Sequence, residues 1–122
     1  YGVNYVTIEG GAGDDSISNS YGGSSNVTIN AGAGNDSVYS YGMNTSISGG
    51  AGDDTIISKR VYSSSDYSKI AGNAGSDIVS IGTSGYAAAL VQYNYGDGDD
   101  TIFGFKSTDT LQITTPKKCF HI

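Results

Sequence analysis

Apolar and polar positions alternate along short stretches of this chain, and glycine-rich turns separate the stretches. Such alternation, with many β-branched residues, is typical of strands with one buried face, as in residues 3–8 and 26–30. Aligning the stretches on the turns predicts three inward-facing ladders: Val6, Val27, Thr45, Ser68 and Val91; Ile8, Ile29, Ile47, Ile70 and Tyr93; and Ile17, Val38, Ile56, Val79 and Ile102. An outward ladder lies between the first two: Thr7, Thr28, Ser46, Lys69 and Gln92.

The turns themselves repeat. Residues 49–57 read Gly-Gly-Ala-Gly-Asp-Asp-Thr-Ile-Ile, and related segments occupy residues 10–18, 31–39, 72–80 and 95–103. Their sixth position is always aspartate, with successive spacings of 21, 18, 23 and 23 residues. A near-constant period of this size is the signature of a solenoid. These sixth-position residues are Asp15, Asp36, Asp54, Asp77 and Asp100.

Each coil therefore contains two strands and two turns, of which only one is acidic. The other turn varies from its shortest form at 41–44 to its longest at 59–67. We predict an all-β, right-handed parallel β-solenoid of about five coils, spanning residues 1–113. A final strand at 109–113, with the bulky Phe103, Phe105, Leu111 and Ile113 nearby, is expected to cap the stack. Residues 114–122 are expected to form an irregular tail.

Composition narrows the picture further. The chain has 19 glycines and few large apolar residues, which favours one domain with a narrow core. Its net charge of −6 comes from eleven aspartates and one glutamate, and nine of the aspartates lie in the repeats. This charge disfavours nucleic acid or an anionic membrane as a partner. There is no apolar run long enough to span a bilayer, and no signal peptide is visible. Because Tyr1 leads almost directly into a strand, we expect a fragment or mature piece of a longer protein, which we predict to be secreted or at the cell surface.

The stacked aspartates call for a cation. Neighbouring coils of a parallel sheet lie about 4.8 Å apart, and like charges at that spacing repel by roughly 3–4 kcal/mol at an effective dielectric near 20. Calcium binds oxygen at about 2.4 Å, so two carboxylates on opposite sides of one ion are separated by nearly the coil spacing. Glycines with positive φ can turn their carbonyl oxygens inward as further ligands. Zinc would favour His and Cys, which the repeats lack.

The pattern Gly-Gly-x-Gly-x-Asp-x-(large apolar)-x resembles the hemolysin-type calcium-binding nonapeptide of the RTX family, a parallel β-roll. Residues 10–18 and 49–57 match it at every defined position, whereas Ala31, Asn73 and Tyr95 replace glycines elsewhere. The resemblance implies up to four Ca²⁺ ions along one edge, each between turns of successive coils. The implied metal ligands are the side chains of Asp15, Asp36, Asp54, Asp77 and Asp100, with the backbone carbonyls of Gly11, Gly13, Gly32, Gly34, Gly50 and Gly52.

The predicted function is a calcium-binding structural module of a bacterial protein, in which calcium stabilises the folded solenoid. The alternative is an adhesion, carbohydrate-binding or protein-binding module that uses residues 59–67 or the tyrosines beside the non-acidic turns: Tyr21, Tyr41, Tyr62 and Tyr86. We predict no catalytic residues, because the outward strand positions are Thr, Ser, Lys and Gln. Cys119 and His121 have no third partner in the tail, and self-association end to end or edge to edge stays open.

Overall fold

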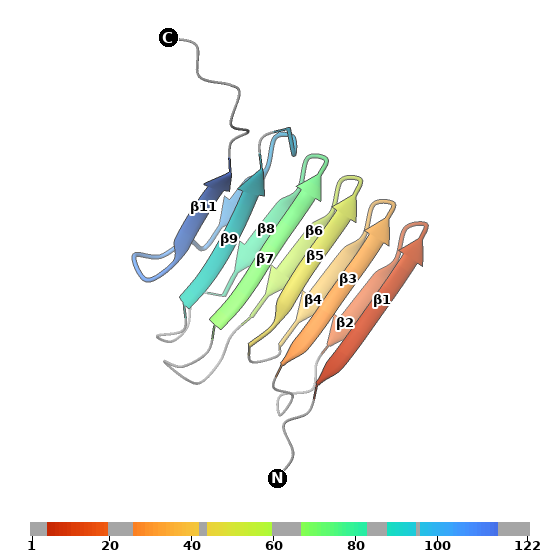
Figure 1. Ribbon diagram of the computed structural model, residues 1–122, viewed down its shortest axis with the longest axis horizontal. Coiled ribbons are helices and arrows are strands. Elements are labelled where there is room, and N and C mark those ends of the chain that lie inside the picture. Colours follow the sequence, from red (N-terminus) through yellow and green to blue (C-terminus); the bar gives the residue numbers. More distant parts are fainter. Residues whose placement is uncertain are drawn as a thin grey trace.

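Two parallel β-sheets stacked face to face make up the computed structural model (Figure 1), which describes residues 5–19, 26–41, 44–59, 67–82, 88–94 and 96–114. The long sheet contains, in order, β1 (Val6–Ala12), β3 (Val27–Ala33), β5 (Ser46–Ala51), β7 (Tyr67–Ala74), β9 (Ala88–Asn94) and β11 (Thr110–Thr114). The short sheet contains β2 (Ser16–Asn19), β4 (Ser37–Ser40), β6 (Thr55–Ser58), β8 (Ile78–Ile81) and β10 (Thr101–Phe103). Every strand pairs with the strand two places further along the chain, which confirms the parallel solenoid.

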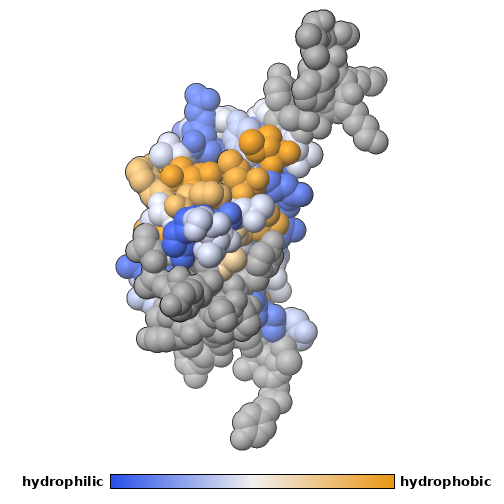
Figure 2. Space-filling model, turned by 90° about the vertical axis from the view of Figure 1, so that its left-hand side faces the viewer, coloured by the Kyte–Doolittle hydropathy of each residue, from blue (hydrophilic) through white to orange (hydrophobic). Residues whose placement is uncertain are grey.

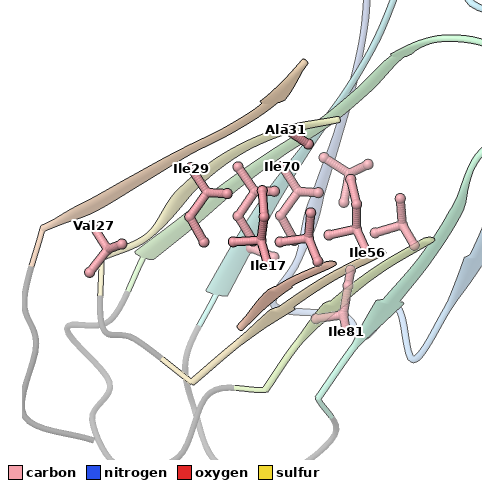
Figure 3. Packing of buried hydrophobic residues seen from close by; sticks show 12 residues of the cluster. Ile17, Val27, Ile29, Ala31, Ile56, Ile70 and Ile81 are labelled. Carbon is pink, nitrogen blue, oxygen red and sulfur yellow. The ribbon is translucent and has the colours of Figure 1, made fainter. Parts of the chain in front are cut away.

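The core is the narrow space between the two sheets. Figure 3 shows Ile29 and Ile70 of the long sheet directed toward Ile17 and Ile56 of the short sheet. Ile29, Ile56 and Ile70 are fully buried, and burial of one such side chain contributes about 1.5–3 kcal/mol. The pairings of the short sheet confirm the third predicted ladder throughout: Ile17 with Val38, Val38 with Ile56, Ile56 with Val79, and Val79 with Ile102.

The first two ladders are confirmed through the fourth coil but not in the fifth. Ile70 pairs with Val91, whereas the turn alignment predicts Tyr93 as its partner. The neighbour of Ser68 is accordingly Ala89, and the outward neighbour of Lys69 is Leu90. The predicted places of Val91, Tyr93 and Gln92 were therefore wrong by two residues.

A two-residue insertion before the fifth acidic turn explains this shift. The paired residues Ile70 and Val91 are 21 apart in the sequence, but the stacked residues Asp77 and Asp100 are 23 apart. At this point Asn94 and Asp97 bind each other: the Asn94 N–H donates to Asp97 Oδ2 (2.7 Å) and the Asp97 N–H donates to the Asn94 carbonyl (3.0 Å). The predicted alignment counted back from the acidic motif, which assumes the same number of residues between strand and turn in every coil. In the fifth coil that number is larger by two.

The last strand joins the end of the long sheet, as expected, with β11 pairing to β9. Asp109 anchors it, because its Oδ1 accepts the Ala89 N–H (2.9 Å) and its Oδ2 accepts the Lys106 N–H (2.8 Å). The bulky side chains expected to cover the stack are themselves exposed, and Figure 2 shows an apolar area on this end of the molecule. The exposed residues are Phe103, Phe105, Leu111 and Ile113. Among the described residues, no helix has the length and hydropathy of a membrane span.

Candidate metal centre

The acidic turns stand side by side along one edge of the solenoid, where the long strands end (Figure 1). Their second and fourth positions have positive φ, which glycine adopts without strain. In the first turn these are Gly11 (φ 110°) and Gly13 (φ 105°). In the fourth turn Asn73 (φ 75°) holds the second position, and asparagine tolerates this region better than most residues. The glycine spacing of the motif is therefore a backbone requirement.

Close stacking is a second reason for these glycines. A Cβ atom added to Gly50 would lie 1.8 Å from the Gly32 carbonyl oxygen, and one on Gly52 would lie 2.1 Å from the Gly34 oxygen. Several of the predicted ligand carbonyls thus face the glycine of the next coil. These carbonyls belong to Gly11, Gly13, Gly32, Gly34 and Gly52.

The five predicted aspartates form one continuous column. The backbone N–H of each of the first four donates to Oδ1 of the aspartate in the next coil, as in Asp36 to Asp54 and Asp54 to Asp77, both at 2.8 Å. The same bond joins Asp15 to Asp36 at 2.7 Å and Asp77 to Asp100 at 3.0 Å. In the middle of the column Asp36, Asp54 and Asp77 are at most 2 % exposed. The sequence predicted the column, but not this hydrogen bond.

The second carboxylate oxygen of the column is unsatisfied. The Oδ2 atoms of Asp15, Asp36, Asp54 and Asp77 are buried and have no hydrogen-bond partner among the described residues. Leaving a charged oxygen buried without a partner costs several kcal/mol, so these atoms favour a proton or a cation.

Burial also changes the proton affinity of the column. It raises the pKa of Asp77 to about 6, although the N–H of Asp54 bonds the carboxylate and acts in the opposite direction. Burial likewise raises the pKa of Asp54 and of Asp100 above the usual value. Neighbouring aspartates add to each increase. The ionised column is therefore under electrostatic strain when nothing compensates its charge.

In the first and third turns, a carbonyl of the next coil borders the same space as Oδ2. A Cβ atom on Gly10 would lie 2.8 Å from Asp15 Oδ2 and 2.3 Å from the Ala31 carbonyl oxygen. One on Gly49 would lie 2.3 Å from Asp54 Oδ2 and 2.8 Å from the Gly72 carbonyl oxygen. The sequence analysis missed these two carbonyls, because it considered only the glycines at the second and fourth positions.

Carboxylate and carbonyl oxygens are the hard ligands that calcium prefers, typically about six to eight at roughly 2.3–2.6 Å. Within the described ranges, no three His, Cys, Asp or Glu side chains gather into one metal-sized group, since the aspartates form a line. The donor set therefore consists of stacked carboxylates with turn carbonyls, which fits Ca²⁺ better than Zn²⁺.

A comparison with protein families agrees with this geometry. The model of the RTX calcium-binding nonapeptide repeat matches four copies, at residues 6–18, 19–42, 41–58 and 96–112, which together cover more than half of the chain. The chain belongs to the RTX calcium-binding repeat family. No curated protein and no solved structure matches it. The fourth acidic turn lies outside the four matched RTX copies, yet the structure places Asp77 in the same column as the others.

The fifth positions of the RTX turns form a separate, exposed column. Asp14 Oδ1 accepts the Asn35 N–H (2.8 Å), Asn35 Oδ1 accepts the Asp53 N–H (2.9 Å), and Asp53 Oδ1 accepts the Ser76 N–H (2.9 Å). These fifth-position residues are exposed to solvent. Their side chains also link successive RTX coils.

The last RTX turn differs from the others. The Tyr93 hydroxyl donates a hydrogen bond to the Gly98 carbonyl, and Asp97 Oδ2 accepts one from the Asn94 N–H. Asp100 accepts the Asp77 N–H but is only partly buried.

The residues proposed for an alternative binding surface are only partly described. Tyr41 packs against Tyr39 with ring centroids 5.6 Å apart, and Lys59 Nζ lies 5.9 Å from the centroid of Tyr39. Tyr21, Tyr62 and Tyr86 lie outside the described residues, as do Cys119 and His121.

Proposed function

We propose that this chain is a calcium-binding structural module, in which ions between the stacked turns stabilise the folded solenoid. The observation that carries the proposal is the row of buried, unpaired Oδ2 atoms on Asp15, Asp36, Asp54 and Asp77. The ligands would be these carboxylates and that of Asp100, together with turn carbonyls: Gly11, Gly13, Gly32, Gly34, Gly50 and Gly52. The carbonyls of Ala31 and Gly72 extend this set, since they face the same space as Oδ2.

The mechanism is thermodynamic linkage. The column exists only when the coils are stacked, so calcium binds the folded chain far better than the unfolded one. A single site stabilises by about 2.7 kcal/mol when free calcium is 100 times its dissociation constant. Extracellular modules bind calcium at roughly 0.1–1 mM. Such a chain would stay unfolded where the calcium concentration is low and fold where it is high.

RTX repeats occur in secreted bacterial proteins, and this supports a place outside the cell for the protein that contains this module. We propose a supporting rather than a catalytic role, with residues 1–113 acting as one unit. Calcium is the partner that the site chemistry supports. Neither nucleic acid nor a membrane span is part of this proposal, and the donor set does not identify a protein or glycan partner.

The proposal is tested by titrating calcium into the chelated chain while following far-UV circular dichroism. We expect the β-sheet signal and the thermal midpoint to rise with calcium and to respond weakly to magnesium, which dehydrates reluctantly. An equal response to both ions, or no response to calcium, would contradict the proposal.

Two adjacent residues offer a matched control. Asp54 is buried in the column, whereas Asp53 is exposed in the outer column, and each uses Oδ1 as a hydrogen-bond acceptor. Asp54→Asn and Asp53→Asn both remove one negative charge and keep that acceptor. Calorimetric titration should show fewer bound ions for Asp54→Asn and an unchanged number for Asp53→Asn. Equal losses in the two variants would point to diffuse charge attraction instead of a site.

A further inference from the structure

The first position of each acidic turn is glycine for a reason other than backbone conformation. Gly10, Gly49 and Gly72 are absent from the glycines with positive φ, in contrast to the second and fourth positions. Alanine is therefore conformationally allowed there, and the second turn demonstrates it, because Ala31 occupies this position and is completely buried. Another constraint must account for the three glycines.

That constraint is the space beside the unpaired carboxylate oxygen. A Cβ atom on Gly10, Gly49 or Gly72 would lie 2.8, 2.3 or 2.0 Å from Oδ2 of the aspartate in the same turn. These separations are shorter than any normal contact between a methyl carbon and an oxygen, so the carboxylate would have to move. At Gly10 and Gly49, a carbonyl oxygen of the next coil borders the same space.

We propose that the first residue of each turn sets the calcium affinity of the pocket beside it, and that Ala31 makes the pocket at Asp36 weaker than those at Asp15 and Asp54. This inference rests on the proposed calcium-binding function. Asp36 is about as deeply buried as Asp54 and its Oδ2 is equally unpaired, but its turn begins with the methyl group of Ala31 where the turn of Asp54 begins with Gly49. The methyl group takes up room that the ion needs and replaces ion–oxygen contact with hydrocarbon. The chain thus combines tight and weak pockets in one column.

The test exchanges glycine and alanine in the full chain. Calcium binding is measured by calorimetry and by terbium luminescence for the wild type, Ala31→Gly and Gly49→Ala. We expect Ala31→Gly to strengthen one site by about tenfold and Gly49→Ala to weaken one site by about the same factor. Ala33→Gly is the matched control, because Ala33 is an exposed residue of the same turn, and its calcium affinity should equal that of the wild type.

Stability measurements separate ligand binding from a purely structural effect. In chelator, Ala31→Gly should unfold at a lower urea concentration than the wild type, because glycine gains freedom in the unfolded chain. In saturating calcium, Ala31→Gly should instead unfold at a higher urea concentration than the wild type.

The possible outcomes distinguish a failure of the proposed calcium-binding function from a failure of the inference about the first position. A wild type that binds no calcium would overturn the proposed function. A wild type that binds calcium, with Ala31→Gly binding no more tightly, would overturn only the role of the first position. If Gly49→Ala fails to fold, Ala31→Gly still decides the question.

Discussion

The third and fifth acidic turns share six of their nine residues but have different surroundings. In the third turn, a Cβ atom on Gly50 would collide with the Gly32 carbonyl, and Asp54 is 1 % exposed with an unpaired Oδ2. In the fifth turn, a Cβ atom on Gly96 would meet nothing within 4 Å, and Asp100 is only partly buried. The difference shows that the motif supplies the ligands, while a following acidic turn stacked on it is what buries the carboxylate, as at Asp15 and Asp54 but not at Asp100.

The largest expected effect comes from adding a methyl group to the second glycine of the third turn. Gly50→Ala combines positive φ with an overlap onto the Gly32 carbonyl oxygen, and should lower the free energy of unfolding by about 3–5 kcal/mol. Gly96→Ala has the conformational cost alone, about 1–2 kcal/mol. Urea unfolding in saturating calcium measures both. Equal losses would mean that the two turns are packed alike.

Neutralising one aspartate should have the next largest effect, with a sign that depends on calcium. In calcium, Asp54→Asn should lose about 2–3 kcal/mol of stability through the lost site, and Asp100→Asn should lose less, because its turn is stacked on one side only within the described residues. In chelator, Asp54→Asn should instead be as stable as the wild type or more so, because the substitution removes a buried charge. A loss of equal size with and without calcium would argue against ion binding at Asp54.

The pH dependence should also change with calcium. The folded pKa of Asp77 is about 6, above its usual value of 3.8, so the folded chain holds this proton more tightly than the unfolded chain. Without calcium, stability should therefore fall as the pH rises from about 4 to about 6, and then level off. With calcium, acidification should instead weaken stability, because protons displace the ion. Urea midpoints between pH 4 and pH 8, with and without chelator, measure this. If the calcium-free chain instead gained stability as the pH rises from about 4 to about 6, this prediction would be contradicted.

The smallest effect concerns the Tyr93 hydroxyl group, which binds the fifth turn. Tyr93→Phe removes the hydrogen bond to the Gly98 carbonyl and should cost about 1 kcal/mol, with or without calcium. Thermal unfolding in both conditions measures the change. A loss that appears in calcium alone would instead assign Tyr93 a part in ion binding.

The sequence predicted most of the fold because each coil repeats the same constraints. The alternation placed Ile29, Ile47 and Ile70 in one buried ladder, and the constant sixth position placed five aspartates in one column. The fifth coil was misaligned by two residues, because the motif fixes the register of the turn and not that of the strand before it. Ile70 accordingly packs beside Val91, while Tyr93 reaches Gly98.

The sequence by itself determined the period, the inward positions and the acidic edge, since these depend on local backbone geometry and side-chain polarity. Only the tertiary structure decided which oxygen of each carboxylate is left without a partner. Whether Oδ1 meets the N–H of the preceding coil, and whether Oδ2 is buried without a partner, depends on residues about twenty positions away. The local sequence pattern does not encode these contacts, because they depend on how closely successive coils stack.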